Sequence, residues 1–263
     1  MLQAAPKKSM YWWLLLASFV VCAIALAPAA LLDWAARRDT TGTLRFASES
    51  GTVWRGQGSV VIALNAIPVV IPIRWRFDPL ALLKLRVGFF IDASAAELDG
   101  TTHIGLRFGE IEFKSTTINA NARLLSMAHA SAALFAPSGK IHLQQADNES
   151  LILRPASNEK ETWYVDGSMS ADAEQIALGG IVNAAVGSHK LKMRGDGASM
   201  SISITPVSGP LQLDGAGILS FAAPRRLTFS GFASTASDAP ASLKQLGPLM
   251  PDGRQRIELN TSW

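Results

Sequence analysis

The sequence predicts a mainly β protein: a single N-terminal transmembrane helix, followed by an antiparallel β-rich domain with a few short helices. Three observations support this fold class. Residues 11–32 contain no charged side chain. From Thr43 onward, apolar and polar residues alternate in short runs, which is typical of strands with one buried and one exposed face. Asp-Gly pairs, a frequent turn sequence, recur between these runs; they are Asp99-Gly100, Asp166-Gly167, Asp196-Gly197, Asp214-Gly215 and Asp252-Gly253.

The uncharged N-terminal run has the length of a membrane span. At 1.5 Å per residue, a helix over residues 11–32 extends about 33 Å, enough for a hydrocarbon core of about 30 Å. Tyr11, Trp12 and Trp13 begin the run, and Trp34 follows it, as expected of aromatic rings at lipid–water boundaries.

A cleaved signal peptide is the alternative, because small residues near Ala27 resemble a cleavage site. The apolar run is longer than the usual signal core, so an uncleaved anchor is favoured. The expected organisation is therefore a tail at 1–10, a transmembrane anchor at 11–32, a linker at 33–42 and a β-rich domain at 43–263.

Composition excludes several function classes. The net charge of +3 is small and evenly spread, whereas nucleic-acid binders cluster Lys and Arg with aromatic residues between them. Cys22 is the only cysteine and lies inside the apolar run. No intrachain disulfide and no thiolate metal site can form, so the domain depends on its own apolar core.

The clearest strand covers residues 69–77. Val69, Ile71, Ile73, Trp75 and Phe77 are predicted to share the buried face, with the intervening arginines on the exposed face. Pro68 and Pro72 cannot donate hydrogen bonds to a neighbouring strand, which predicts an edge strand or a bulge.

Asp78-Pro79 predicts the start of a short helix. Asp is a favourable N-cap residue, and Pro is accommodated at the first helical position. So short a helix is unstable alone, and it is therefore expected to pack on the sheet. The leucines of this segment are Leu80, Leu82, Leu83 and Leu85.

The same alternation recurs to the end of the chain, interrupted by two segments that resemble short helices, at 120–135 and 239–246. A proline that opens a strand, a phenylalanine that closes it and a following helix occur twice, at Pro72–Phe77 and Pro224–Phe229. This repetition suggests two similar halves, 43–137 and 138–263; coincidence among common strand residues is the alternative.

No motif for catalysis, cofactor binding or metal binding is visible. The four histidines are not spaced as zinc ligands, and no nucleophile elbow or phosphate-binding loop occurs. Glu110 and Glu112 share a strand face and could act as paired acids on a glycoside, but a solvated face beside Lys114 is the favoured interpretation. A non-enzymatic protein without cofactor or metal is expected.

Several segments resemble type II secretion system protein N, also called general secretion pathway protein N. They are Gly51-Thr-Val-Trp54-Arg-Gly56 with Gly58, the junction Arg74-Trp75-Arg-Phe77-Asp-Pro79-Leu80, Leu211-Gln-Leu-Asp-Gly215-Ala-Gly217, Phe229-Ser-Gly231 and Leu243-Lys-Gln-Leu246-Gly247. The resemblance covers most of the chain after Thr43, and residues 115–178 depart most from the pattern.

The resemblance implies a non-catalytic inner-membrane component that supports the export of folded proteins through the outer-membrane secretin. The implied partners are protein C, the inner-membrane platform proteins, the secretin and inner-membrane lipids, with no nucleic acid. The implied orientation is a single pass with the N-terminus in the cytoplasm and the β-rich domain in the periplasm.

The strand-and-helix plan is also similar to that of AsmA-like proteins, which are linked to lipid transport and envelope maintenance. In that alternative, an open β-groove lined by Trp75, Phe77, Leu106 and Phe108 exposes apolar surface to lipid. Alternation predicts that one face of the sheet is apolar, but it does not predict what contacts that face. The sequence alone therefore leaves open both the secretion component and the lipid-binding groove.

Overall fold

The computed structural model describes residues 8–39, 44–64, 67–128, 130–146, 149–156, 163–180, 183–222, 224–237, 239–245 and 247–262. The predicted fold class is confirmed in its main part, an antiparallel β-rich chain with few short helices. The helices are α1 (Lys8–Ala25), α2 (Ala30–Asp39), the 3-10 helix η1 (Pro79–Lys84), α3 (Arg123–Ala128), α4 (Ala130–Phe135) and the 3-10 helix η2 (Leu243–Gln245).

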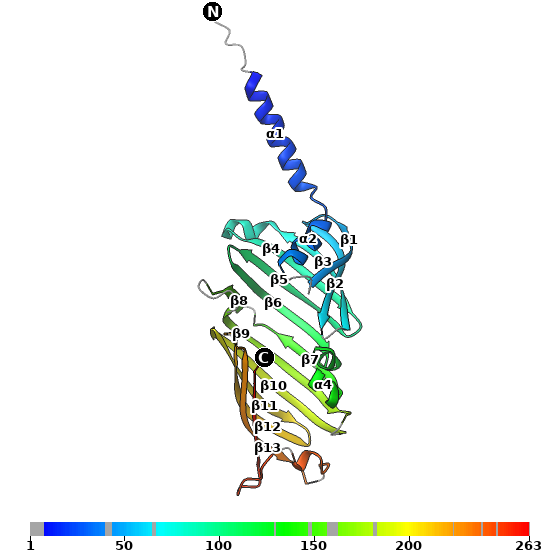
Figure 1. Ribbon diagram of the computed structural model, residues 1–263, viewed down its shortest axis with the longest axis vertical. Coiled ribbons are helices and arrows are strands. Elements are labelled where there is room, and N and C mark those ends of the chain that lie inside the picture. Colours follow the sequence, from blue (N-terminus) through cyan, green and yellow to red (C-terminus); the bar gives the residue numbers. More distant parts are fainter. Residues whose placement is uncertain are drawn as a thin grey trace, which may run out of the picture.

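The strands follow one another along a single long sheet (Figure 1). They are β1 (Leu44–Gly51), β2 (Arg55–Leu64), β3 (Ile67–Asp78), β4 (Val87–Ala95), β5 (Leu98–Arg107), β6 (Glu110–Asn121), β7 (Pro137–Gln144), β8 (Ser150–Pro155), β9 (Trp163–Leu178), β10 (Ala184–Gly197), β11 (Ser199–Ser208), β12 (Leu211–Ser220), β13 (Arg226–Thr235) and β14 (Gln255–Ser262).

Neighbouring strands are antiparallel and occur in sequence order, because short connections join most of them. Strand β8 is the exception, since it pairs with β6 and β9 beside β7. The boundary suggested between two halves falls at the start of β7, which pairs with β6 and β9, so the sheet continues through it. The two-halves interpretation stays a prediction.

One row of apolar or glycine residues crosses every strand from β2 to β14 except β8. Directly paired residues have their side chains on one face of a sheet, so this row defines what we call the inner face. Its members, in spatial order, are Gly58, Ile73, Ala93, Gly100, Ile118, Leu143, Ala171, Leu191, Ile204, Gly215, Gly231 and Ile257.

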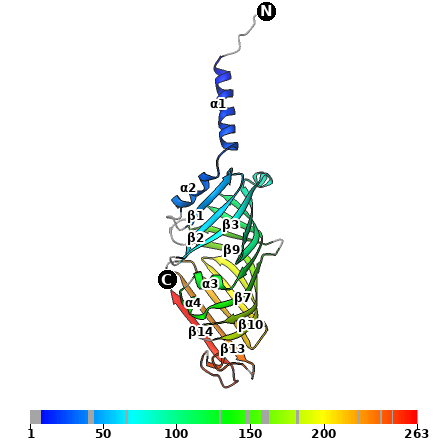
Figure 2. The same ribbon diagram turned by 90° about the vertical axis from the view of Figure 1, so that its right-hand side faces the viewer.

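Two separate cores cover the ends of the inner face. Near the N-terminus, Ala29 packs against Ile73 and Trp75, with Leu32 of α2 beside them. At the other end, Leu243 of η2 is buried against residues of β10, β12 and β13. Figure 2 shows α2 and the η2 segment at opposite ends of the sheet.

Strand β3 has the predicted faces. Ile73 and Trp75 are buried on the inner face, while Arg74 on the other face is exposed. The prolines also obey the prediction in part: β4 pairs with β3 only from Ile73 onward, so Pro68 and Pro72 lie where β3 has β2 as its partner but a free opposite edge.

Helix η1 begins as predicted. The Asp78 side chain accepts a hydrogen bond from Leu80 N at 3.0 Å, and Pro79 occupies the first turn. The helix also packs on the sheet as expected, although its leucines are not the side chains that make this contact. Ala81 is the residue that packs, over Gly88 of β4, and the four leucine side chains are exposed.

Three of the five Asp-Gly pairs lie within strands and do not form turns. A Cβ at Gly100 would lie 2.3 Å from Thr117 O, and one at Gly167 would lie 1.8 Å from Ser150 O, so these glycines allow close backbone approach. The third pair is Asp214-Gly215, in β12.

The N-terminal segment differs from the prediction. Helix α1 ends at Ala25, and a turn around Pro28 separates it from α2, so residues 11–32 do not form one helix. Residues 33–39, expected in a linker, lie in α2. Among the described residues, no helix combines the length and apolar character needed to cross a membrane.

Candidate functional site: the anchor junction and the inner-face groove

The segment Gly51–Gly56 joins the end of α1 to the sheet. Trp54 Nε1 donates a hydrogen bond to Ile24 O at 2.7 Å, and Val53 N donates to Ala27 O at 2.9 Å. Ala29 N in turn donates to Gly51 O at 3.2 Å. Ile24 O also accepts from Ala27 N at 3.2 Å, so these bonds tie the last turn of α1 and the residues after it to the turn between β1 and β2.

Aromatic rings from three elements support this junction. The Trp54 ring packs edge-on against Phe77 at 4.9 Å between ring centroids, and Phe77 packs against Phe89 at 5.9 Å. Trp75 Nε1 lies 3.1 Å from the carbonyl oxygens of both Thr52 and Val53. Side chains of β3 thus pack against the turn and stabilise it.

The glycines in and beside the turn allow its close packing against the Trp75 ring and the neighbouring backbone. A Cβ at Gly56 would lie 2.5 Å from Trp75 Cζ2, so only glycine lets the indole lie flat on β2. Gly51 has a φ of +96°, a conformation that other residues rarely adopt. Gly58 begins the inner-face row, where a Cβ would meet Glu49 Cα at 3.2 Å.

The second group of family-motif residues lies at the other end of the sheet. Gly215, Gly217 and Gly231 surround the ring of Phe229, and a Cβ on Gly215 would lie 2.6 Å from Phe229 Cζ. Gly247 N donates to the Gln255 side chain at 3.2 Å and lies close to the backbone of β14. The structure therefore brings the predicted residues together as two separate packing groups.

Beside the C-terminal core, on strands β9 to β14, the inner face carries an open groove of about 1000 Å³. Its floor is a second apolar row, from β9 to β14, parallel to the first; the members are Met169, Met193, Ile202, Gly217, Phe229 and Leu259. Lys192, Arg194 and Glu258 alternate with these apolar residues along their strands, so their side chains lie on the outer face.

The groove is not where the sequence-based alternative placed it. Trp75 is only 5% exposed, under the N-terminal core, and Phe108 is fully exposed in the turn between β5 and β6. The methionine and isoleucine positions of β9–β11 were visible in the sequence, but their alignment in one row depends on the register between strands.

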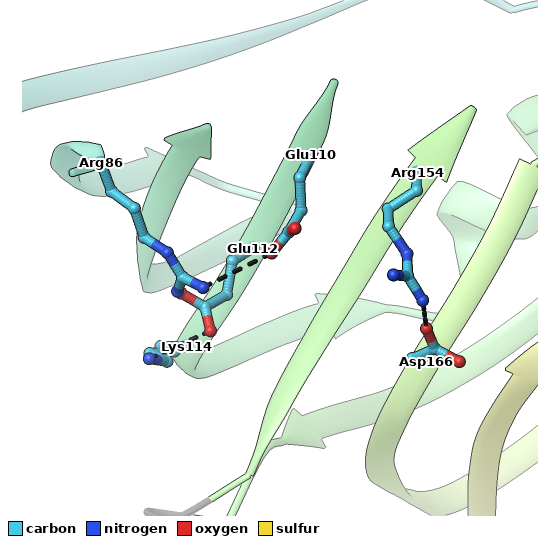
Figure 3. A network of polar contacts seen from close by, with 6 residues as sticks. All are labelled: Arg86, Glu110, Glu112, Lys114, Arg154 and Asp166. Carbon is cyan, nitrogen blue, oxygen red and sulfur yellow. Dashed lines mark hydrogen bonds and ion pairs between the residues drawn. The ribbon is translucent and has the colours of Figure 1, made fainter. Parts of the chain in front are cut away.

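A polar network occupies the outer face, opposite the inner-face row (Figure 3). Arg86 bonds to Glu112 of β6, and Lys114 Nζ lies 3.0 Å from the same carboxylate. Glu112 is 5% exposed, so the expectation of a solvated strand face is wrong at this position. A second, more exposed pair, Arg154 with Asp166, lies on β8 and β9.

The charge of Glu112 indicates a structural role. Burial raises its pKa, but hydrogen bonds and charge from Arg86 and Lys114 outweigh this effect, so the pKa lies below its ordinary value. A glycosidase general acid needs a raised pKa. Glu112 is thus held ionised and is a poor proton donor near neutral pH.

The described histidines do not form a metal site. His103 Nε2 lies 3.0 Å from Asp78 Oδ2, and His189 is buried and accepts a hydrogen bond from Leu213 N. Burial lowers the pKa of His189 and favours its neutral form. His129 lies outside the described residues, among which no group of three or more metal-binding side chains occurs.

The comparison with protein families gives one match. The family model for Type II secretion system (T2SS), protein N matches residues 42–258, which is most of the chain. The chain belongs to this family. The resemblance proposed from the sequence is confirmed, and with it an involvement in type II secretion. Neither the curated proteins nor the solved structures include a match to the chain.

Proposed function

We propose that this protein is a non-catalytic component of the type II secretion system that acts by contact with other parts of the machine. The family match over residues 42–258 is the observation that carries the proposal. The geometry supports it, because the family-motif residues serve packing and an open apolar surface remains available.

The edge of β14 beyond Arg256 is the proposed contact for a protein partner, since Pro248 and Leu249 already pair with the first residues of this strand. Strand β14 is the last in the sheet, and its neighbour on one side is β13. An unpaired edge can accept a strand from another chain, and side chains of the adjacent groove can add specificity. Protein C, the platform proteins and the secretin are the candidate partners that the family implies.

We also propose that α1 holds the protein at the inner membrane, with the N-terminus in the cytoplasm and the sheet in the periplasm. Its apolar side chains are largely exposed, including those of Trp12, Trp13 and Phe19. Burial of such surface in lipid is favourable. Retention of the protein in the membrane pellet after carbonate washing is expected, whereas release of an intact protein would contradict this placement.

Deletion of the gene tests the main proposal. Folded substrates are expected to accumulate in the periplasm while the lipid composition of the outer membrane stays normal. In cells, a photo-crosslinking residue in place of Asn260, exposed on β14, should capture another secretion component. The same residue in place of Arg74, exposed on β3, is the matched control. Normal export in the deletion strain would refute the proposal.

The inner-face groove supports a second candidate function, the binding of a lipid acyl chain, as in the AsmA-like alternative. The specific observation is the apolar row of β9–β14 along a groove of about 1000 Å³. A photo-crosslinking residue at Ile202 would then capture phospholipid. Capture of a secretion component at Ile202, with normal lipid transport in the deletion strain, would exclude this candidate.

A further inference from the structure

Large apolar side chains gather at one corner of the sheet without any intramolecular role. Leu83 and Leu85 of the η1 segment are 83% and 82% exposed, and Phe108 is fully exposed in the turn between β5 and β6. Leu80 and Leu82 beside them are also exposed. Such exposure shows that these side chains protrude from the surface and do not line a pocket.

The η1 segment and the β5–β6 turn are neighbours. Val87, which follows the η1 segment, pairs with Leu106 at the end of β5, and Arg86 contacts Glu110 just beyond the turn. We call this corner, residues 80–85 together with 106–109, the apolar tip. Exposed apolar clusters of this kind mark sites of contact with another phase or molecule.

The tip lies at the end of the sheet from which α1 leaves. Figure 1 and Figure 2 both show the short helical turn after β3 level with α2 and the last turn of α1. The hydrogen bonds of Trp54 and Val53 to the end of α1 hold this arrangement. If α1 is inserted in a membrane, the apolar tip therefore lies close to the surface of that membrane.

The charges around the tip favour anionic lipid. Lys84 and Arg107 are exposed, and no ion pair in the described part of the chain involves either. The nearest acids already have partners within the sheet: Asp78 bonds to His103 at 3.0 Å, and Glu110 lies 3.5 Å from the Arg86 guanidinium. Protruding leucines flanked by unpaired basic side chains match the acyl and headgroup layers of a bilayer.

We propose that the apolar tip is a second membrane contact, which inserts its leucines and Phe108 into the lipid surface and sets the tilt of the sheet. The inference rests on the proposed placement of α1 at the membrane. It commits to lipid as the occupant, because these side chains protrude from a convex corner flanked by the exposed basic residues Lys84 and Arg107.

Spin labelling of the full-length protein in vesicles of phosphatidylethanolamine and phosphatidylglycerol tests this contact. A Cys22→Ser background carries one label at a time, at Leu83→Cys, Phe108→Cys or the control Leu249→Cys. Leu249 is 72% exposed and pairs with Gln255 of β14, at the opposite end of the strand order from β1. At the tip positions, collisions with oxygen should exceed those with an aqueous nickel complex, and the control should show the reverse.

The native Cys22 separates the two proposals. In one outcome, lipid protects the Cys22 label from the nickel complex, while the Leu83 label is as accessible to nickel as the Leu249 label. This result would refute the proposed membrane contact of the tip and leave the placement of α1 intact. A Cys22 label open to nickel would overturn the α1 placement, whatever the tip shows. A tip label protected only after another secretion component is added would identify a protein contact and refute the lipid assignment.

The basic residues give an independent readout. In vesicles with phosphatidylglycerol, Lys84→Glu and Arg107→Glu should move the Leu83 label toward the aqueous phase, since each basic side chain near an anionic surface strengthens binding roughly fivefold. Lys192→Glu, exposed on the outer face of the distant strand β10, should leave the label depth unchanged. Equal depth in all three variants would contradict the role of charge at the tip.

Discussion

At the scale of single residues, burial separates positions that look alike in the sequence. Trp75 and Arg74 are neighbours on β3, but Trp75 packs under Ala29 and bonds to the Thr52 and Val53 carbonyls, whereas Arg74 is exposed. Glu110 and Glu112 are likewise two residues apart, yet only Glu112 is fully buried.

Trp75→Ala should lower the free energy of unfolding by about 3–5 kcal/mol, because it removes a large buried ring and leaves a cavity. Arg74→Ala should change it by less than about 0.5 kcal/mol. Urea midpoints of the two variants measure this difference. A larger loss in Arg74→Ala would mean that the two faces of β3 are exchanged.

Arg86→Met should destabilise the protein by about 3 kcal/mol at pH 7, because Glu112 then stays buried with Lys114 as its remaining partner. The Glu112 pKa is depressed below its ordinary 4.5, so the stability it contributes is present above that pH and is lost as the pH falls through the folded pKa. Urea midpoints should therefore differ less between wild type and variant at pH 3 than at pH 7.

The matched control is Arg154→Met, which breaks the exposed pair with Asp166. Its effect at pH 7 should be within about 1 kcal/mol, since exposed ion pairs contribute little. Equal losses in Arg154→Met and Arg86→Met would show that burial of Glu112 is unimportant.

At the scale of elements, the junction between α1 and the sheet depends on a short turn. Residues 51–56 form no regular helix, but their backbone and the Trp54 indole complete the hydrogen bonds at the end of α1. The 3-10 helix η1 shows the opposite case: one alanine packs on the sheet, and its leucines face outward.

Trp54→Phe should loosen the junction while the sheet stays folded. It removes the 2.7 Å bond to Ile24 O but keeps an aromatic ring beside Phe77. Loss of one such bond costs about 1 kcal/mol, so the amides of Ala29 and Val53 should exchange hydrogen roughly fivefold faster. Trp54→Ala, which also loses the ring contact, should exchange faster still; unchanged exchange in both would mean that the turn does not hold α1.

At the scale of the whole molecule, the sheet is long and one face is only partly covered. The accessible surface is 17055 Å², against about 11,000 Å² expected for a compact monomer of this mass. The excess comes from an extended shape, the exposed helix α1 and the uncovered middle of the inner face. A protein of this shape leaves room for partners along its length.

Ile73 and Ile202 both face inward, and their replacement by serine tests how far the inner face is covered. Ile73→Ser, in the core under α2, should cost about 3 kcal/mol or more. Ile202→Ser, in the groove, should cost only about 1 kcal/mol. Similar urea midpoints for the two variants would indicate that the groove is closed in solution.

The sequence alone determined the local features of this protein. Alternation assigned the buried face of β3 correctly, Asp78-Pro79 marked the start of η1, and residues 120–135 and 239–246 contain the helices α3, α4 and η2 as expected. These features depend on neighbouring residues, so period and capping chemistry are sufficient to predict them. The family could also be recognised, because its glycine and aromatic motifs are contiguous.

Only the tertiary structure decided which segments cover the sheet. The alignment of apolar positions into one inner row, the burial of Glu112 and the exposure of the η1 leucines all depend on residues distant in sequence. The placement of the end of α1 against the sheet has the same origin, since Ile24 O and Ala27 O accept hydrogen bonds from the turn between β1 and β2. Alternation of apolar and polar residues predicts that a strand has one apolar face. Strand register and long-range packing determine which side chains contact that face.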